Sequence, residues 1–176
     1  MMSNLAYEHL HHNLKLLKLT TLESILDNYL EISIKEGKSF VETLDYLVEQ
    51  EIQSKEARSK AVRMKIADFP FSKRLNDFDF KYQPSIDKTA IKEIESLRFI
   101  RNAEDIVFLG LPGVGKTHLA IGLGIEAVDA GFKASFANAS NLVEKLEAAD
   151  KAAMIFTSNK SFGEWGDIFR DHVIAS

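Results

Sequence analysis

The sequence predicts an α/β protein in which a helical N-terminal half precedes a half built on a parallel sheet. Two observations support this prediction. Over roughly the first 75 residues, apolar residues recur at steps of three and four, the period of a helix with one buried face. After residue 105, short apolar runs alternate with helical segments, as in sheets whose parallel strands are joined by helices. We therefore expect two domains, residues 1–75 and 76–176.

The composition excludes several classes of protein. Of the 176 residues, 45% are hydrophobic and 27% charged, which is typical of a globular domain with a sizeable core. There is no cysteine, and this rules out disulfides, cysteine-based zinc sites and thiolate nucleophiles. No apolar run is long enough to cross a membrane, and the first residues lack the pattern of a signal peptide. We expect a cytoplasmic protein that has no membrane contact.

Capping signals divide the helical half into its elements. The Thr20–Thr21 pair offers an N-cap that splits the first apolar run into two helices. Ser39 and Glu42 have the spacing of a capping box, so a further helix should begin there. Its apolar residues thin out into a basic stretch, and we expect it to end near Ala67. The aromatic segment 71–86 is too apolar for a free linker and should pack along the next domain.

The second half carries the strands. A helix capped by Asp87 should run through residue 100, before a buried strand at Ile106–Leu109. A helix from Lys116 to about residue 130 follows, in which two glycines, Gly122 and Gly124, let it lie close to the sheet. Further elements are then expected in chain order: a strand at Lys133–Ala137, a helix over 141–149 and a strand at Ala152–Thr157.

One motif carries recognisable chemistry. It has the form G-x-x-x-x-G-K-[ST] and consists of Gly110, Leu111, Pro112, Gly113, Val114, Gly115, Lys116 and Thr117. Its glycines let backbone N–H groups turn toward phosphate oxygens at the N-terminus of the next helix. The lysine ammonium would reach the β- and γ-phosphates of ATP, and the Thr117 hydroxyl would bind Mg²⁺. The motif predicts a P-loop that binds ATP together with Mg²⁺.

The acidic group that P-loop hydrolases use to hold metal and water has no counterpart in the sequence. The last expected strand ends Thr157-Ser158-Asn159, with no carboxylate where it leaves the sheet. Glu144, Glu147 and Asp150 lie on or just after an expected helix, where they are interpreted as solvated charges. The residue pattern alone does not decide whether ATP is hydrolysed.

The net charge of −4 conceals a basic run between Lys55 and Arg74. Its seven basic residues against two acidic ones give a local charge of +5. Such a run either contacts the phosphates of double-stranded DNA or merely solvates a helix, and charge alone does not decide between the two.

The segment GLPGVGKTHLA at 110–120, with Gly131, Thr157–Asn159 and Trp165, resembles the IstB-like ATP-binding proteins. These are AAA+ helpers of insertion-sequence transposition and relatives of DnaC-type helicase loaders. The motifs at Ala67–Pro70 and Phe78–Phe80 extend the resemblance over nearly the whole chain. It implies ATP-dependent assembly into a homo-oligomer on double-stranded DNA and action on a cognate transposase. Two alternatives are a replicative helicase loader and a remnant that binds nucleotide without turning it over.

The resemblance also assigns roles at the site. It implies that Lys116 and Asn159 are catalytic, the latter as the polar sensor at a strand tip. His118 belongs to the same motif and either contacts nucleotide or packs against the connector.

This chain departs from the family pattern in the spacing of its site residues. Only 42 positions separate Thr117 from Asn159, where the family places two further strand–helix units. We expect an internal deletion with its junction near Asp150–Lys151, which removes a third strand and its acidic metal pair. From the same resemblance we expect the family's arginine finger and fifth strand to be missing as well, because the sequence ends at Ser176. The fold predicted is an incomplete P-loop NTPase domain of AAA+ type, in which the resemblance implies that the strand at 106–109 lies beside the strand at 152–157.

Overall fold

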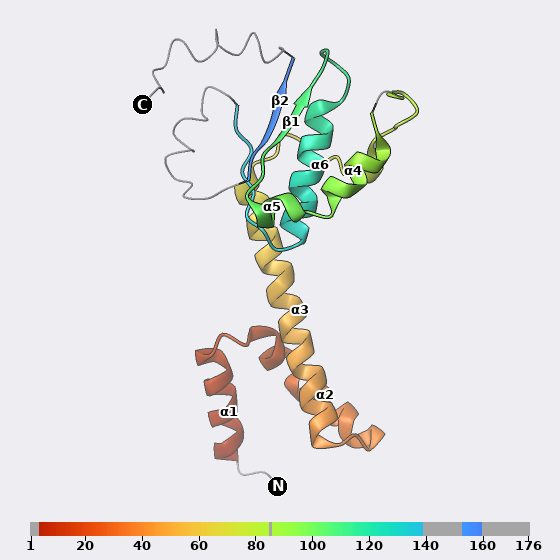
Figure 1. The fold of residues 1–176 in the computed structure, drawn as a ribbon. Coiled ribbons are helices and arrows are strands. Elements are labelled where there is room, and N and C mark those ends of the chain that lie inside the picture. The colour runs from red at the N-terminus through yellow and green to blue at the C-terminus, as the bar shows by residue number, and fades with distance from the viewer. Residues whose placement is uncertain (1–3, 85, 139–152, 160–176) are drawn as a thin grey trace. The chain divides into compact units, whose positions relative to one another are not determined.

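A computed structural model of the chain describes residues 4–84, 86–138 and 153–159 (Figure 1). The chain divides into two compact units, Met1–Ala61 and Val62–Ser176. In chain order the elements are α1 (Asn4–Leu16), α2 (Thr20–Glu36), α3 (Phe40–Ala67), the 3-10 helix η1 (Leu75–Asp77), α4 (Lys88–Glu95), α5 (Arg98–Asn102), β1 (Ile106–Leu109), α6 (Lys116–Asp129) and β2 (Ile155–Ser158). Among the described helices, none is both long and apolar enough to pass through a membrane.

The first unit is built from α1, α2 and most of α3 around a small apolar core. The core consists of Leu14, Leu22, Leu26, Tyr29 and Leu47. The predicted capping box at the start of α3 is confirmed. The Ser39 N–H donates to Glu42 Oε2 at 2.8 Å, and the Glu42 N–H donates to Ser39 Oγ at 3.3 Å. The expected end of this helix at Ala67 is confirmed as well.

The predicted N-cap of α2 is wrong in its chemistry, although the division into two helices is confirmed. Thr20 is the first residue of the helix, the cap position is Leu19, and no side chain caps it from within the loop. Instead, Glu51 of α3 accepts hydrogen bonds from the N–H groups of Thr21 and Leu22, at 2.8 and 2.9 Å. A tertiary carboxylate thus takes over the role that sequence-local capping predicts for threonine.

In the second unit, β1 and β2 form a parallel pair, as predicted, with Ile106 opposite Ile155 and Leu109 opposite Ser158. Side chains of β1, β2, α4 and α6 share one apolar cluster with η1, including Leu75, Leu119 and Leu123. The expected strand at Lys133–Ala137 is wrong: these residues form no strand. The backbone N–H of Phe136 donates instead to the carbonyl of Ala67, at the end of α3, at 2.7 Å. The helix expected over 141–149 lies outside the described residues.

The single helix expected between Asp87 and residue 100 is interrupted. Asp87 does cap α4, through a 2.8 Å bond from the Thr89 N–H. The helix then stops, and Leu97 adopts a left-handed φ of +59° before α5 begins. The break brings both Leu97 and Phe99 into the core, where they are 8% and 7% exposed. In one continuous helix these two residues would lie on nearly opposite sides, and only one of them could be buried.

The aromatic segment 71–86, here called the connector, packs along the second unit as predicted, and its contact is with α6, where two helix glycines allow a close approach. A Cβ at Gly122 would lie 2.8 Å from Leu75 Cδ2, and one at Gly124 would lie 2.7 Å from Phe69 Cζ. The expectation that these glycines bring α6 close to the sheet is therefore wrong, because the neighbours that require them are Leu75 of the connector and Phe69, just after the end of α3.

Candidate functional site

The loop between β1 and α6 has a backbone that only glycine adopts easily at three of its positions. Gly110, Gly113 and Gly115 have φ values of +152°, +81° and +92°. Space is also tight at the last of these, because a Cβ on Gly115 would lie 2.5 Å from Phe78 Cε2 of the connector. The glycines thus allow the loop to turn, and the ring of Phe78 packs against it at Gly115. It leads directly into the first turn of α6, whose N–H groups have no acceptor inside the helix.

Lys116 lies on the inside of this loop. Its side chain is largely buried, with a residue exposure of 9%, and its ammonium donates to the carbonyls of Gly110 and Leu111, both at 2.7 Å. These two carbonyls hold the charge at the mouth of the loop. An anion placed there would meet a positive charge that is already oriented and partly removed from water.

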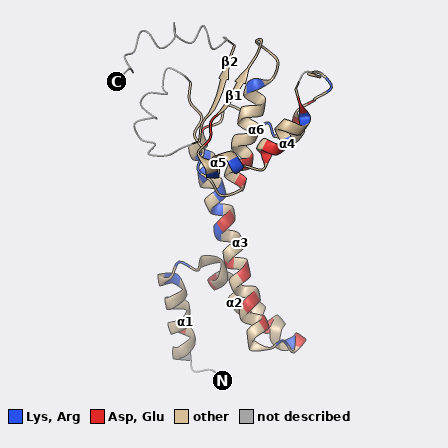
Figure 2. Ribbon diagram, viewed as in Figure 1, with Lys and Arg blue, Asp and Glu red and all other residues tan. Residues whose placement is uncertain are grey.

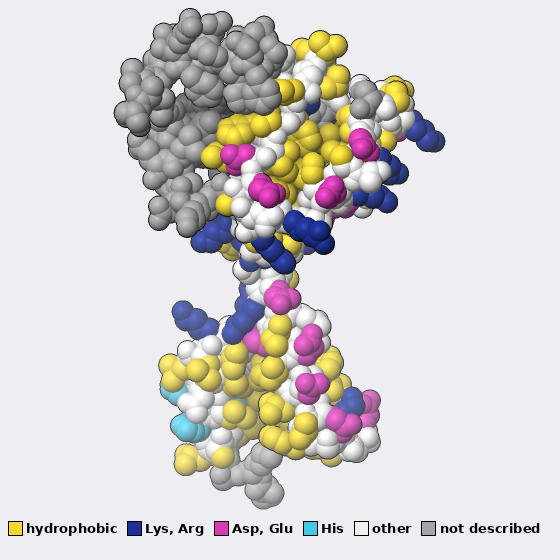
Figure 3. Space-filling view, in the orientation of Figure 1, with side chains coloured by type: hydrophobic (Ala, Val, Ile, Leu, Met, Phe, Trp, Pro, Cys, Tyr) yellow, Lys and Arg dark blue, Asp and Glu magenta, His cyan; other side chains and the backbone are white. Residues whose placement is uncertain are grey.

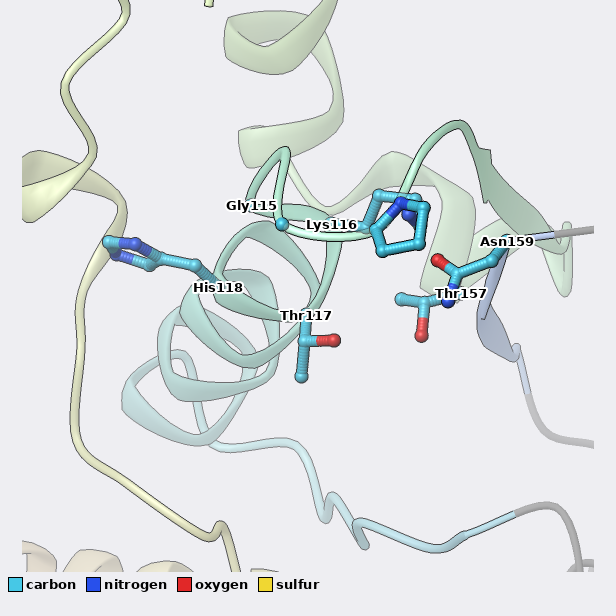
Figure 4. A pocket seen from close by; sticks show the side chains of 8 residues that line it. Gly115, Lys116, Thr117, His118, Thr157 and Asn159 are labelled. Carbon is cyan, nitrogen blue, oxygen red and sulfur yellow. The ribbon is translucent and has the colours of Figure 1, made fainter. Parts of the chain in front are cut away.

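A pocket of about 370 Å³ opens in front of the loop. It is lined by Pro112, Gly113, Gly115, Lys116, Thr117, His118, Thr157 and Asn159. Figure 4 shows side chains of α6 and of the end of β2 facing this space from two sides. In the described part of the chain, no carboxylate lines the pocket, so its charge comes from Lys116 and from the N-terminal end of α6. A volume of this size is within the range of small-molecule sites.

His118 lines the pocket, but its ring turns toward the connector (Figure 4). Its Nε2 lies 2.9 Å from the carbonyl oxygen of Arg74, and its ring meets Phe78 edge-on at 5.2 Å between centroids. Of the two roles weighed for this residue, these contacts support packing against the connector.

Arg74 also attaches the connector to α6, nearer the C-terminal end of the helix. Its guanidinium pairs with Asp129 at 2.9 Å and with Glu126 at 3.2 Å. The hydrogen bond and charge of Asp129, with a smaller effect of Glu126, raise the pKa of Arg74. This arginine of the basic run therefore anchors the connector.

Other members of the basic run are also engaged within the chain. Arg58 pairs with Glu51 at 3.2 Å and donates to Thr20 Oγ1 at 2.8 Å, while Lys55 lies 3.8 Å from the same carboxylate. Lys65 and Lys73 are exposed. The run is thus divided between residues that stabilise the fold and residues that face solvent.

The structure brings most of the predicted site residues together. Pro112, Gly113, Gly115–His118 and Asn159 share the pocket. Leu111 and Val114 contribute to the loop without lining the pocket, and the Leu111 side chain is 75% exposed. Two contributors were not predicted: Thr157, which lines the pocket from β2, and Phe78, which supports Gly115. Thr157 could have been found, since it ends the strand expected beside β1.

Comparison with known proteins finds consistent relatives. The sequence pattern of the "IstB-like ATP binding protein" family matches residues 12–152. A protein of insertion sequence IS5376 from Geobacillus stearothermophilus, named for ATP binding, is 37% identical over an alignment covering 78% of this chain and 73% of the relative. Its IS21 counterpart from Pseudomonas aeruginosa is 32% identical, covering 91% and 77%. The IS232 counterpart from Bacillus thuringiensis is 40% identical, covering 82% and 58%.

The lengths of two of these alignments show that the relatives have positions with no residue in this chain. The Pseudomonas alignment has 205 positions but spans 91% of this chain, about 160 residues, so about 45 positions have no residue here. The Geobacillus alignment has 183 positions over about 137 residues of this chain, which leaves a gap of nearly the same size. In contrast, the 144-position alignment with the Bacillus relative covers 82% of this chain, which is its full 144 residues. The family match itself ends at residue 152, beside the expected junction at Asp150–Lys151.

Proposed function

This chain belongs to the IstB-like ATP-binding proteins, and from that membership we propose that it binds ATP with Mg²⁺ through Gly110–Thr117 as an accessory protein of DNA transposition. The observation that carries the proposal is the buried ammonium of Lys116, held by two loop carbonyls at the mouth of a pocket of ligand size. Phosphate oxygens would replace those carbonyls as its partners. The N–H groups at the start of α6 would bind the same phosphates.

The remaining site residues fit the same ligand. The hydroxyl of Thr117 would bind Mg²⁺, whose charge neutralises the phosphates when it is present. Asn159 lines the pocket from the end of β2, where its amide can donate to a terminal phosphate oxygen (Figure 4). His118 acts on the nucleotide only indirectly, by fixing the start of α6 against the connector.

Titration calorimetry with ATP and MgCl₂ tests this proposal. We expect one nucleotide per chain, and we expect Lys116→Ala to lose binding, because it removes the oriented charge. Lys92→Ala is the matched control: it removes an exposed lysine of α4 in the same unit and should bind normally. Equal affinity of the wild type and Lys116→Ala would show that the loop is not the site.

We further assign DNA and transposase contact to the N-terminal residues 1–75. Lys65 and Lys73, exposed lysines of the basic run, support the DNA contact. Few side chains that could read base edges lie near this run, so it suits attraction to phosphates rather than recognition of a base sequence. Membership in the family and the insertion-sequence names of the relatives support the transposase contact.

A second candidate is a protein that binds ATP without hydrolysing it. Two findings favour it. No carboxylate lines the pocket within the described residues, and about 45 positions in the alignments with two relatives have no residue in this chain. Without an acid to orient metal and water, the bound nucleotide would act as a structural ligand.

A further inference from the structure

The four residues Gly115–His118 form the turn that begins α6. The first hydrogen bond within this helix runs from the Leu119 N–H to the Gly115 carbonyl, at 3.0 Å. The N–H groups of the four residues before Leu119 therefore have no acceptor inside the helix. All four residues line the pocket. We call them the phosphate-binding turn, because their N–H groups are the ones that would bind phosphate.

The connector holds the phosphate-binding turn at both of its ends. At the first residue, a Cβ on Gly115 would lie 2.5 Å from Phe78 Cε2, so the aromatic ring packs directly against this backbone. At the last residue, His118 Nε2 lies 2.9 Å from the carbonyl oxygen of Arg74. A carbonyl oxygen only accepts, so Nε2 carries a proton and donates it. The rings of Phe78 and His118 also meet edge-on, and this joins the two contacts.

The connector is itself fixed along the rest of α6. The guanidinium of Arg74 pairs with Asp129 and Glu126, at 2.9 and 3.2 Å. Leu75 is buried, and Asp77 accepts the Arg74 N–H at 2.8 Å. Both kinds of contact are visible on this unit: Figure 2 shows residues of both charges on its helices, and Figure 3 shows hydrophobic side chains beside α4 and α6. The connector therefore holds the turn from a base that is anchored by charge and by apolar packing.

We propose that nucleotide binding and the packing of the connector on α6 are coupled, with Phe78 and His118 as the positioning residues of the phosphate-binding turn. This coupling rests on the proposed binding of ATP at Gly110–Thr117. A turn that is held in place before the ligand arrives does not have to be ordered on binding, so the connector raises nucleotide affinity. Linkage is reciprocal, and bound nucleotide must stabilise the packed connector by the same factor.

A variant of the connector tests the first half of this coupling. In titration calorimetry with ATP and MgCl₂, Phe78→Ala should raise the Kd about tenfold, within the usual range of coupling between sites. Ile91→Ala is the matched control. Ile91 is buried in the same apolar cluster as Leu75, but it lies on α4 and does not line the pocket. This control should lower stability in urea denaturation and leave the ATP affinity unchanged, with both variants measured where they are fully folded.

Two variants of His118 separate positioning from packing. His118→Phe keeps a ring beside Phe78 but removes the donor to the Arg74 carbonyl, and we expect the Kd for ATP to rise about fivefold. His118→Gln returns an N–H donor close to the place of Nε2 and should recover most of the lost affinity. Loss of affinity that follows the donor rather than the ring is not expected from packing alone.

Hydrogen exchange in the full chain tests the second half. The N–H groups of Asp77 and Phe78 donate to the carbonyls of Arg74 and Leu75, each at 3.1 Å, so their exchange reports opening of the connector. Saturating ATP should slow exchange at these two amides by a factor comparable to the affinity loss in Phe78→Ala. The same ATP concentration should leave their exchange unchanged in Lys116→Ala.

Four results contradict the coupling. Equal weakening of ATP binding in Phe78→Ala and Ile91→Ala assigns the effect to stability. His118→Phe with the affinity of the wild type removes the role of the donor. Exchange at Asp77 and Phe78 that ATP leaves unchanged, while calorimetry shows binding, rejects the coupling and leaves the proposed function intact. A wild type that does not bind ATP overturns both.

Discussion

Glu51, in the middle of α3, accepts a hydrogen bond from the backbone N–H of Leu22 at 2.9 Å and so caps α2 from a helix 29 positions away. The same oxygen accepts the N–H of Thr21 at 2.8 Å. The carboxylate is only 3% exposed. We predict that Glu51→Ala lowers the free energy of unfolding by about 1–3 kcal/mol, the cost of leaving buried donors without partners. Urea denaturation followed by circular dichroism measures it. Glu49→Ala, an exposed neighbour, should cost far less.

The same cap makes stability depend on pH. Desolvation works to raise the pKa of Glu51, but the N–H groups of Leu22 and Thr21, with the charges of Lys55 and Arg58, outweigh it and lower the pKa below its ordinary 4.5. Because the folded pKa is depressed, the carboxylate stabilises the fold at neutral pH, and this contribution is lost as the pH falls through the lowered pKa. The difference in unfolding free energy between wild type and Glu51→Gln should therefore shrink in acid. A difference that stays constant from pH 7 into the acid range would contradict this.

The close approach at Gly122 predicts a cost for any side chain there. Gly122→Ala places a methyl group 3.0 Å from the backbone nitrogen of Leu75 as well as against its side chain, and backbone cannot move aside cheaply. Overpacking of this kind costs about 1–3 kcal/mol. The gain of up to about 1 kcal/mol from alanine in a helix offsets it only in part. A double-mutant cycle with Leu75→Ala checks the cause, since removing the Leu75 side chain should recover part of the loss.

The phosphate loop was predictable from sequence because its chemistry depends on residues that lie within eight positions of one another. The parallel pairing of β1 with β2 was predicted as well, but the apolar runs indicated only the strands, and the resemblance to the family implied that they are neighbours. The cap from Glu51 was not, because it requires knowing that two helices meet, and local rules favoured Thr20–Thr21. The expected strand at Lys133–Ala137 failed for a similar reason: Phe136 bonds to Ala67, a distant carbonyl at the end of a helix.

The basic run can be tested for DNA contact without disturbing the fold. Lys65 and Lys73 are exposed, whereas Arg58 is paired with Glu51 and Arg74 anchors the connector. We predict that Lys65→Gln with Lys73→Gln weakens binding to unrelated duplexes by similar factors. The log–log salt slope should fall by about 0.9 per lost phosphate contact. Fluorescence anisotropy over a salt series measures both. Arg58→Gln is the variant for comparison. It removes the ion pair with Glu51, so it should lower the stability of the fold, which the lysine variant should leave unchanged. Unchanged affinity and slope in the lysine variant would assign the run to solvation of the helix.

The last prediction concerns turnover of ATP. The described pocket holds the phosphates through Lys116 and the start of α6, and it offers hydroxyl and amide groups at Thr157 and Asn159, but it presents no carboxylate to accept a proton from attacking water. General acid–base groups contribute about 10²–10⁴-fold to such reactions, and neither a hydroxyl nor an amide replaces one at neutral pH. We therefore expect the purified chain to bind ATP stoichiometrically while releasing phosphate at the background rate, with or without duplex DNA. Phosphate release under multiple-turnover conditions measures this, beside calorimetric binding on the same sample. Lys116→Ala is the control that separates a contaminating ATPase from activity of this site. Sustained release by the wild type that disappears in Lys116→Ala would show that the chain supplies a catalytic acid after all.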